Sequence, residues 1–424
     1  MSTASSSSYL WTGLLIFLAT ATYLFRFAPT SAPDTLSPEL SMLSKVAIDV
    51  LTADIKTLQH WLQHGHGTSA TLVELYLSQI HKHDGYLHAM IQTRSLDLLL
   101  ETARTLDQER QAGNLRGPLH GIPIIIKDNI ATRPSFGLRT TAGSLALFSS
   151  KPPQNAKIVD MVSDHAPFAS TRLLTGIMLP SGWSALGGQT QSAYVRGGLD
   201  PNDTKDGHSS PSGSSSGSAV AVSAGYAPVS IGTETDGSLI CPAGRAALYS
   251  IKPTIGLVSQ AGIVPVSQNF DSAGPLTKTV ADLAIVLDAI TDRGPNKSFT
   301  SNLTRSWSDI SVGTLDPEVW KFPDNFIKPM HSATLQTNAD IRNAYMKIKP
   351  LVKSFSENVP LRLLETIELN GESSEMVVTR ADLRDTLNAY LEDLDESDVR
   401  SVQELIDFNI KHSEQELPPG EDCT

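Results

Sequence analysis

The chain has 424 residues, of which 40 % are hydrophobic, and its 33 lysines and arginines against 45 aspartates and glutamates give a formal net charge of -12. This length and apolar content predict a globular protein with a substantial core. The acidic balance argues against a nucleic-acid partner, because phosphate contacts need a basic face. With only Cys241 and Cys423, one chain can build neither a disulfide framework nor a thiolate zinc site.

An apolar run, YLWTGLLIFLATATYLF, follows the polar residues 1–8 and extends from Tyr9 to Phe25. It is close to the length that a helix needs to cross a bilayer. Because residues 1–8 contain no lysine or arginine, the run differs from a secretory signal peptide. We therefore predict a single-pass membrane anchor over residues 9–26, with secretion after signal cleavage as the alternative. Arg26 and Lys45 favour a cytoplasmic catalytic region.

Residues 27–44 are rich in Pro, Ser and Thr, show no hydrophobic periodicity and are typical of a linker. We assign residues 45–424 to one domain, with a core over 115–290. Charged stretches such as RADLRDTLNAYLEDLDE mark residues 291–424 as a variable region of solvated amphipathic helices.

Two helices are expected early in this domain. Ser69 is a candidate N-cap for a helix with one apolar face that ends near Gly85. Ser95 opens a second helix, LDLLLETARTLDQERQAG, which Gly113 ends.

The segment IPIIIKDNI is a short β-branched run bounded by Pro123 and Asn129, and it predicts a buried strand. It carries Lys127 near its end. An isolated lysine there would by default point outward into solvent. Desolvation behind three isoleucines would instead lower its pKa and leave a neutral amine.

A serine-rich stretch begins at Gly207 and reads GHSSPSGSSSGSAVAVSAGYAPVSIGTETDGSLICPAG. A flexible linker would continue into polar low-complexity sequence. Here the serines lead directly into SAVAVSAGYAP, which has the small apolar residues of a helix packed on a sheet and ends at Gly225. VSIGTETDG then predicts a strand followed by a tight turn. We therefore interpret the stretch as part of the core.

A nucleophilic serine needs a proton acceptor, and histidine is the usual one. The histidines of the first helices are His60, His64, His66, His81 and His83. His60 and His64 have i, i+4 spacing, but they lack carboxylate partners at a recognised metal-site spacing, so we interpret this group as surface histidines. A lysine that acts through hydroxyl groups remains as the base. No metal or cofactor is expected.

Three separated motifs resemble the amidase signature family, the Ser-Ser-Lys hydrolases that include fungal amidases, fatty acid amide hydrolase and the amidase subunit of the glutamyl-tRNA amidotransferase. They are GPLHGIPIIIKDN, SPSGSSSGSAVAVSAGYAPVSIGTETDGSLICPA, and the pair IKPTIGLVS and FDSAGPLTKTVADLA. The resemblance extends from about Leu72 to Leu287. It implies an α/β fold, a single domain with a central mixed β-sheet flanked by helices on both faces.

The resemblance also implies roles for particular residues. Lys127 is the base, Ser214 is the bridging serine on a cis peptide, and Ser238 is the nucleophile that attacks the amide carbonyl. The turn Thr235, Asp236, Gly237 and Ser238 would offer backbone N–H groups to the oxyanion. Ser215 matches a serine beside the bridge, and with Ser212 and Ser216 it is expected to form a hydrogen-bonding scaffold.

The chain departs from the family pattern in several places. Ile240 stands where an arginine is usual, and Asp236 where glycine is common. Residues 161–180 do not resemble the family's usual helix and strand end. The sequence also stops before the family's usual closing section, from which we expect an incomplete C-terminal part.

Two other interpretations were weighed. GSSSG, from Gly213 to Gly217, matches the G-x-S-x-G nucleophile elbow with Ser215 as nucleophile, but the turn-forming DPNDTKDGHSSP precedes it where the elbow needs a strand. The other alternative is a catalytically inactive, membrane-anchored relative. Our prediction is an amidase acting on a small-molecule amide, with no tRNA-dependent role. The substrate's identity and a homodimer are left open.

Overall fold

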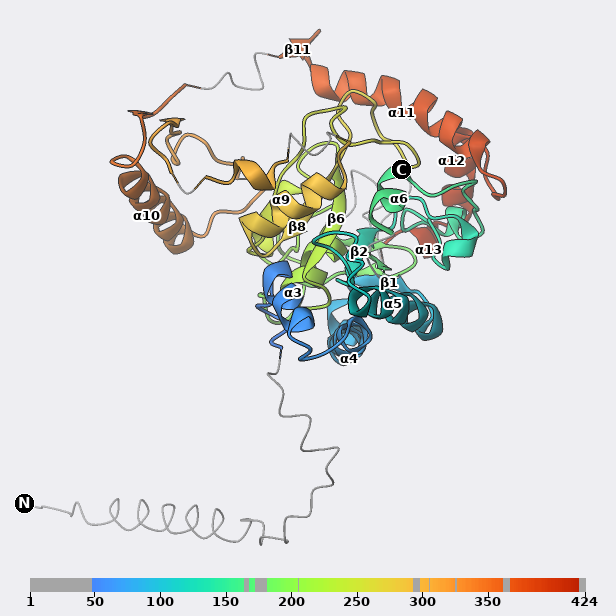
Figure 1. The fold of residues 1–424 in the computed structure, drawn as a ribbon. Coiled ribbons are helices and arrows are strands. Elements are labelled where there is room, and N and C mark those ends of the chain that lie inside the picture. Colours follow the sequence, from blue (N-terminus) through green and yellow to red (C-terminus); the bar gives the residue numbers. More distant parts are fainter. Residues whose placement is uncertain are drawn as a thin grey trace, which may run out of the picture. The chain divides into compact units, whose positions relative to one another are not determined.

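The protein is described by a computed structural model over residues 48–163, 168–171, 181–204, 206–292, 298–304, 306–324, 326–360 and 367–418 (Figure 1). The residues from Ile48 onward form one compact unit. This agrees with the predicted single α/β domain, which combines a mixed sheet with surrounding helices.

A six-stranded sheet forms the centre of the domain, with the strand order β1-β3-β2-β6-β8-β7. β2 is parallel to both β3 and β6, whereas β1 is antiparallel to β3 and β8 is antiparallel to both β6 and β7. The sheet is therefore mixed, as predicted. In this spatial order the strands are Met90–Thr93, Phe168–Thr171, Ile124–Lys127, Val229–Glu234, Ser272–Thr277 and Tyr249–Ser250.

Successive residues of β2 face opposite sides of the sheet. Ile124 and Ile126 belong to the cluster that includes residues of α3 (Ile55–Gln63), α4 (Ser69–Leu87) and α9 (Val280–Ala289). Ile125 instead packs with Val220 and Ala221 of α7 (Ser216–Ser223). Helices thus cover both faces, and the alternation places Lys127 on the same side as Ile125, toward α7.

The first helices follow the predicted pattern with two corrections. The N-cap of α4 is Thr68, whose hydroxyl accepts from the Thr71 N–H, and not Ser69. Gly85 does not end α4, because the helix continues until His88 takes a left-handed conformation with φ 47°. Ser95 caps α5 (Leu96–Gln111) as predicted.

Residues 161–180 contain two described pieces. The end of α6 (Lys157–Ser163) and the strand β3 lie within this range, and β3 pairs with β2 along its whole length. The sequence that did not resemble the family pattern therefore still supplies a central strand. Residues 164–167 and 172–180 are outside the described part.

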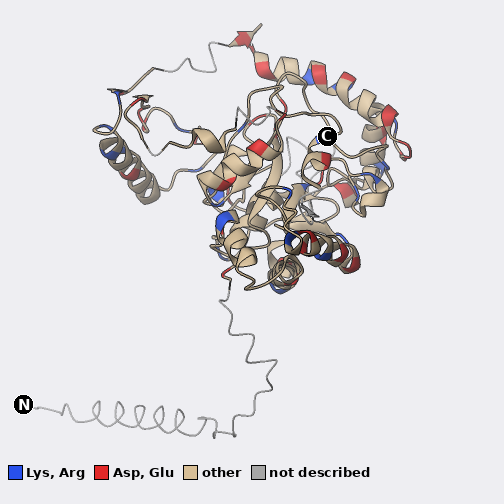
Figure 2. Ribbon diagram, in the orientation of Figure 1, with Lys and Arg blue, Asp and Glu red and all other residues tan. Residues whose placement is uncertain are grey.

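In the described part of residues 291–424, helices alternate with short strands and loops. In Figure 2, acidic and basic residues alternate along α11 (Ser374–Asp393), and its apolar side buries Leu387 and Leu391 against Ala146 and Leu147. The remaining short elements are β4 (Trp183–Ser184), β5 (Gly188–Gln189), α8 (Ile240–Arg245), β9 (Ser311–Gly313), α10 (His331–Ile348), β10 (Ser354–Ser356), β11 (Glu368–Leu369), β12 (Glu372–Ser373), α12 (Val402–Lys411), α13 (Ser413–Glu416) and the 3-10 turns Pro134–Phe136, Leu145–Leu147 and Thr300–Asn302.

The prediction of a single-pass membrane protein is withdrawn. Across the residues that the structure describes, no helix combines the length and the apolar character that crossing a bilayer requires. The proposed anchor itself, residues 9–26, lies outside the described residues.

Candidate active site

Lys127 ends strand β2, and its side chain is fully buried, which is the second of the two alternatives that the sequence left open. Its Nζ lies 2.7 Å from Ser214 Oγ, 3.0 Å from the carbonyl oxygen of Thr233 and 2.9 Å from Thr233 Oγ1. Burial lowers the pKa of Lys127 well below its usual value, and the carboxylates of Glu234 and Asp271 oppose this shift only in part. The site therefore favours a neutral amine.

These three contacts match the bonding capacity of a neutral amine, which has two N–H bonds and one lone pair. The Thr233 carbonyl can only accept, and Thr233 Oγ1 can accept while its own hydrogen points to Asn129 Oδ1, 3.4 Å away. With both N–H bonds used in this way, the lone pair remains for the O–H of Ser214. Lys127 is thus arranged to accept a proton from Ser214.

Ser214 lies in the segment just before helix α7, and the Gly213–Ser214 peptide bond is cis, as the resemblance implied. Asp206 anchors this segment, since its two carboxylate oxygens each accept a hydroxyl at 3.0 Å, from Ser210 and Ser212. Ser212 has φ 59°, and its carbonyl oxygen accepts from the hydroxyl of Ser216. Ser212 and Ser216 therefore form part of the scaffold around Ser214.

Ser215 is fully buried and connects the segment to strand β6 and to the turn that follows it. Its Oγ donates to the Thr233 carbonyl at 3.1 Å, and its backbone N–H donates to the carbonyl oxygen of Ser238 at 3.2 Å. In the described residues 206–214 no strand leads into Ser215, which is the N-cap of α7. A nucleophile elbow requires an exposed serine between a strand and a helix, so this arrangement does not fit one.

The turn Thr235–Ser238, here called the nucleophile turn, connects β6 to α8. Gly237 has φ 71°, and a Cβ there would lie 3.0 Å from Cys241 Sγ, so both the backbone and the space favour glycine. Glu234, the residue before the turn, binds the two residues that follow it. Its Oε2 accepts the N–H groups of Leu239 at 2.7 Å and Ile240 at 3.1 Å.

The carbonyl and amide groups of the nucleophile turn differ in their bonding. The Thr235 carbonyl accepts a hydrogen bond from Lys252 Nζ. The Gly237 carbonyl accepts from the Cys241 N–H, and the Ser238 carbonyl accepts from the Ser215 N–H. By contrast, no described residue accepts from the backbone N–H groups of residues 236–238. Unpaired N–H groups on a tight turn can bind a developing negative charge.

The hydroxyl of Ser238 is only partly buried and has no hydrogen-bond partner within the described ranges. The structure therefore joins Lys127 directly to Ser214. It joins the Ser214 segment to Ser238 through the backbone of Ser215, and not through a hydrogen bond between the two hydroxyls.

Sequence reasoning missed several residues at this site. Thr233 and Asn129 shape the surroundings of Lys127, Glu234 closes the nucleophile turn, and Lys252 and Asp271 bind Thr235. The motifs IKPTIGLVS and FDSAGPL contain Lys252 and Asp271, but nothing in the sequence alone indicated which turn they contact.

The predicted surface histidines do not approach this site's hydrogen-bond network. His60 of α3 and His64, which caps the C-terminus of this helix, are both exposed, with ring centroids 3.9 Å apart. In the part of the chain that the structure describes, no group of three or more His, Cys, Asp and Glu side chains is placed to hold a metal ion.

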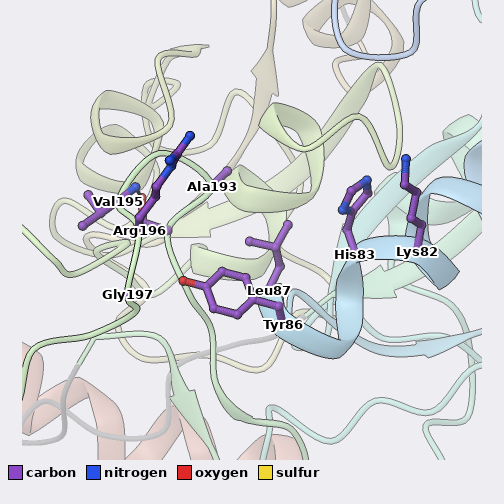
Figure 3. Close-up of a pocket in the computed structure, with 9 residues that line it drawn as sticks. Lys82, His83, Tyr86, Leu87, Ala193, Val195, Arg196 and Gly197 are labelled. Carbon is purple, nitrogen blue, oxygen red and sulfur yellow. Dashed lines mark hydrogen bonds between the residues drawn. The ribbon is translucent and has the colours of Figure 1, made fainter. Parts of the chain in front are cut away.

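A separate cavity of about 490 Å³ is lined by the end of α4 and by Ser192, Ala193, Val195, Arg196 and Gly197 (Figure 3). Its walls carry the basic side chains of Lys82, His83 and Arg196, and Tyr86 and Leu87 contribute apolar surface. None of the residues implied in catalysis lines it.

Residues 71–359 match the family model described as Amidase. A probable amidase of Arabidopsis thaliana is 36 % identical over 362 residues, which are 82 % of this chain and 66 % of the relative. A putative amidase of Schizosaccharomyces pombe is 30 % identical over 411 residues, 90 % of this chain and 66 % of the relative. The structure of native peptide amidase from Stenotrophomonas maltophilia superposes with a TM-score of 0.71 at 33 % identity, covering 87 % of this chain and 73 % of that one. The chain thus spans just under two thirds of the length of the two curated relatives.

Proposed function

Because this chain belongs to the amidase family, we propose that it hydrolyses the C–N bond of a carboxylic amide through an acyl-enzyme on Ser238. The substrate is a small-molecule amide. The contact between Lys127 Nζ and Ser214 Oγ at 2.7 Å, in a site that favours a neutral amine, is the observation that carries this proposal.

The first step is the attack of Ser238 Oγ on the amide carbonyl carbon. As the O–C bond forms, the Ser238 proton passes to Ser214, and the Ser214 proton passes to the lone pair of Lys127. The two hydroxyls have no direct hydrogen bond without substrate, so this step requires rotation of the partly exposed Ser238 side chain. Catalytic hydrogen bonds are often long before substrate binds and tighten in the complex.

The tetrahedral intermediate carries its negative charge on the former carbonyl oxygen. The N–H groups of residues 236–238, which have no described protein acceptor, are suited to bind this oxygen. Each such donor is typically worth about 3 to 4 kcal/mol of transition-state stabilisation.

Collapse of the intermediate breaks the C–N bond. The proton held by Lys127 returns through Ser214 to the leaving nitrogen, which departs as ammonia or an amine. Water then attacks the ester on Ser238 while the same relay accepts its proton, and the carboxylic acid leaves. As the ester C–O bond breaks, the relay returns this proton to Ser238 Oγ. Acylation therefore restores the neutral Lys127, and deacylation restores both the neutral Lys127 and the free serine.

The test is amide hydrolysis by the parent chain and by a Ser238→Ala variant, on a panel that contains a peptide amide and an apolar acyl anilide. We expect the parent to release amine and Ser238→Ala to show no release above background. Ser223→Ala is the matched control, because the one hydrogen bond of the Ser223 hydroxyl to a described residue is to the Val220 carbonyl within its own helix. Equal rates in the parent and Ser238→Ala would contradict the proposal, and so would a parent that hydrolyses no amide.

A further inference from the structure

Thr235 is held from two sides by residues with no role in the relay. Its hydroxyl donates to Asp271 Oδ1 at 2.6 Å, and its carbonyl oxygen accepts from Lys252 Nζ at 2.5 Å. Asp271 is itself fixed, because its other oxygen accepts the N–H groups of Val266 at 2.7 Å and Ser267 at 2.9 Å. A single residue of the nucleophile turn thus receives both a side-chain and a backbone anchor.

The backbone anchor has a geometric consequence. The carbonyl of Thr235 and the N–H of Asp236 belong to one planar peptide unit, and in a trans peptide they point in opposite directions. When Lys252 Nζ holds the carbonyl on one side, the Asp236 N–H must point to the other side. Rotation of this unit would replace the N–H donor with a carbonyl oxygen, which repels an oxyanion.

Two other carbonyls of the turn are held by backbone amides that belong to helix starts. The carbonyl of Gly237 accepts from the Cys241 N–H at 2.8 Å, and that of Ser238 from the Ser215 N–H at 3.2 Å. The peptide that joins Thr235 to Asp236 lies before these bonds and depends on a side chain from a distant segment.

We propose that Lys252 is a positioning residue that fixes the orientation of the Thr235–Asp236 peptide, and that Asp271 supports it by holding the Thr235 side chain, so that the Asp236 N–H is presented to the oxyanion. This inference rests on the proposed function for its catalytic consequence. The orientation itself follows from the contacts to Thr235 and is testable without turnover.

The principal variant is Lys252→Met, which removes the donor and keeps a long unbranched side chain. We expect kcat to fall about tenfold or more with KM little changed, short of the roughly 100- to 1,000-fold loss caused by deleting an oxyanion donor. An arylboronic acid, which forms a tetrahedral anionic adduct with serine, should bind correspondingly more weakly. Lys252→Arg retains a donor and should recover part of both losses.

Lys278→Met is the matched control. Lys278 Nζ also donates to a backbone carbonyl, that of Val50 at 2.6 Å, but neither residue contacts the nucleophile turn. This variant should keep the parental kcat and boronate affinity even if its thermal stability falls. Equal losses of kcat in the two variants at matched stability would assign Lys252 a merely structural role and overturn the inference.

A crystal structure of Lys252→Met separates this inference from the proposed function. We expect the Thr235 carbonyl to leave its present direction and the Asp236 N–H to rotate with it. An unchanged peptide, or a parental kcat in Lys252→Met, would overturn the inference. An inactive parent whose peptide rotates in the variant would refute the proposed function alone and support the positioning role.

Discussion

Gly232 of β6 faces the hydroxyl of Ser215 so closely that a Cβ at this glycine would lie 2.6 Å from Ser215 Oγ. The same Cβ would lie 2.9 Å from side-chain carbons of both Leu239 and Leu276. The absence of a side chain at Gly232 therefore allows Ser215 to reach the Thr233 backbone.

The first prediction concerns Gly232→Ala. The added methyl group overfills a well-packed site, so the free energy of unfolding should fall by about 1 to 3 kcal/mol. Activity should also fall, because Ser215 and Lys127 share the Thr233 carbonyl as acceptor. Chemical denaturation and amide hydrolysis measure the two effects.

Gly244→Ala is the control for this substitution. Gly244 lies in α8, and a Cβ there would meet no atom within 4 Å. The helix should gain up to about 1 kcal/mol from the better propensity of alanine. Equal free energies of unfolding for Gly232→Ala and Gly244→Ala would contradict the close packing of Ser215 against β6.

A second prediction follows from the lowered pKa of Lys127. The relay needs the neutral amine, so kcat/KM should fall as the pH drops through the pKa of Lys127 in the free enzyme. Buffers of constant ionic strength allow this profile to be recorded over the range in which the fold is intact. A rate independent of pH down to the onset of acid unfolding would argue against Lys127 as the base.

The lowered pKa of Lys127 also makes the free energy of unfolding depend on pH. Between the lowered pKa and the usual value of 10.5, the unfolded chain carries a proton on Lys127 that the folded chain lacks, so stability rises with pH in this window. Lys127→Met removes this dependence. The stability of the variant relative to the parent should therefore be highest at low pH and decline toward pH 10.5. The opposite slope would contradict the burial of an uncharged amine.

The third prediction concerns Asp282 in α9. Burial, with the nearby Asp54 charge adding to it, raises the pKa of Asp282 to about 7 from 3.8. Between these values the folded chain holds a proton that the unfolded chain has lost, so this group lowers stability increasingly as the pH rises. Asp282→Asn, which can still accept from the Ile55 N–H through Oδ1, should gain stability relative to the parent between pH 4 and 8.

Asp288 in the same helix provides a control of opposite sign. Hydrogen bonds from Ser298, Phe299 and Thr300 outweigh its partial burial and hold its pKa below the usual value. Asp288→Asn should therefore lose stability at neutral pH, and this loss should shrink as the pH falls through the lowered pKa. Thermal unfolding at several pH values compares the two variants, and slopes of the same sign would contradict these assignments.

The strand that carries Lys127 could be predicted from sequence because it depends on local pattern, whereas the central mixed sheet was implied by the family resemblance. Three isoleucines predict a buried strand, and the structure confirms it at Ile124–Lys127. The pattern left open whether Lys127 points outward or stays in the core, and the structure shows that it is fully buried. The choice of Ser214 and Ser238 among many serines came from the family resemblance. Serines in one stretch are chemically alike, and only their partners distinguish them.

The parts that could not be predicted depend on contacts between distant segments. Lys252 and Asp271 reach Thr235 from 17 and 36 residues along the chain, a separation at which no pattern of hydrophobicity identifies a partner. The end of α4 was misplaced for a local reason. Asp84 accepts the N–H groups of Ala89 and Met90 and stabilises the chain beyond the helix, so Gly85 need not act as a stop.

Covalent labelling is the most direct test of the central claim, that Lys127 and Ser214 activate Ser238. The chain is treated with a fluorophosphonate, and the modified residue is located by peptide mass spectrometry in the parent, in Lys127→Met and in Ser223→Ala. The account predicts a single adduct on Ser238, formed at the same rate in Ser223→Ala and far more slowly in Lys127→Met. An adduct on Ser215 or on another residue, no adduct in the parent, or an equal rate in Lys127→Met would contradict it.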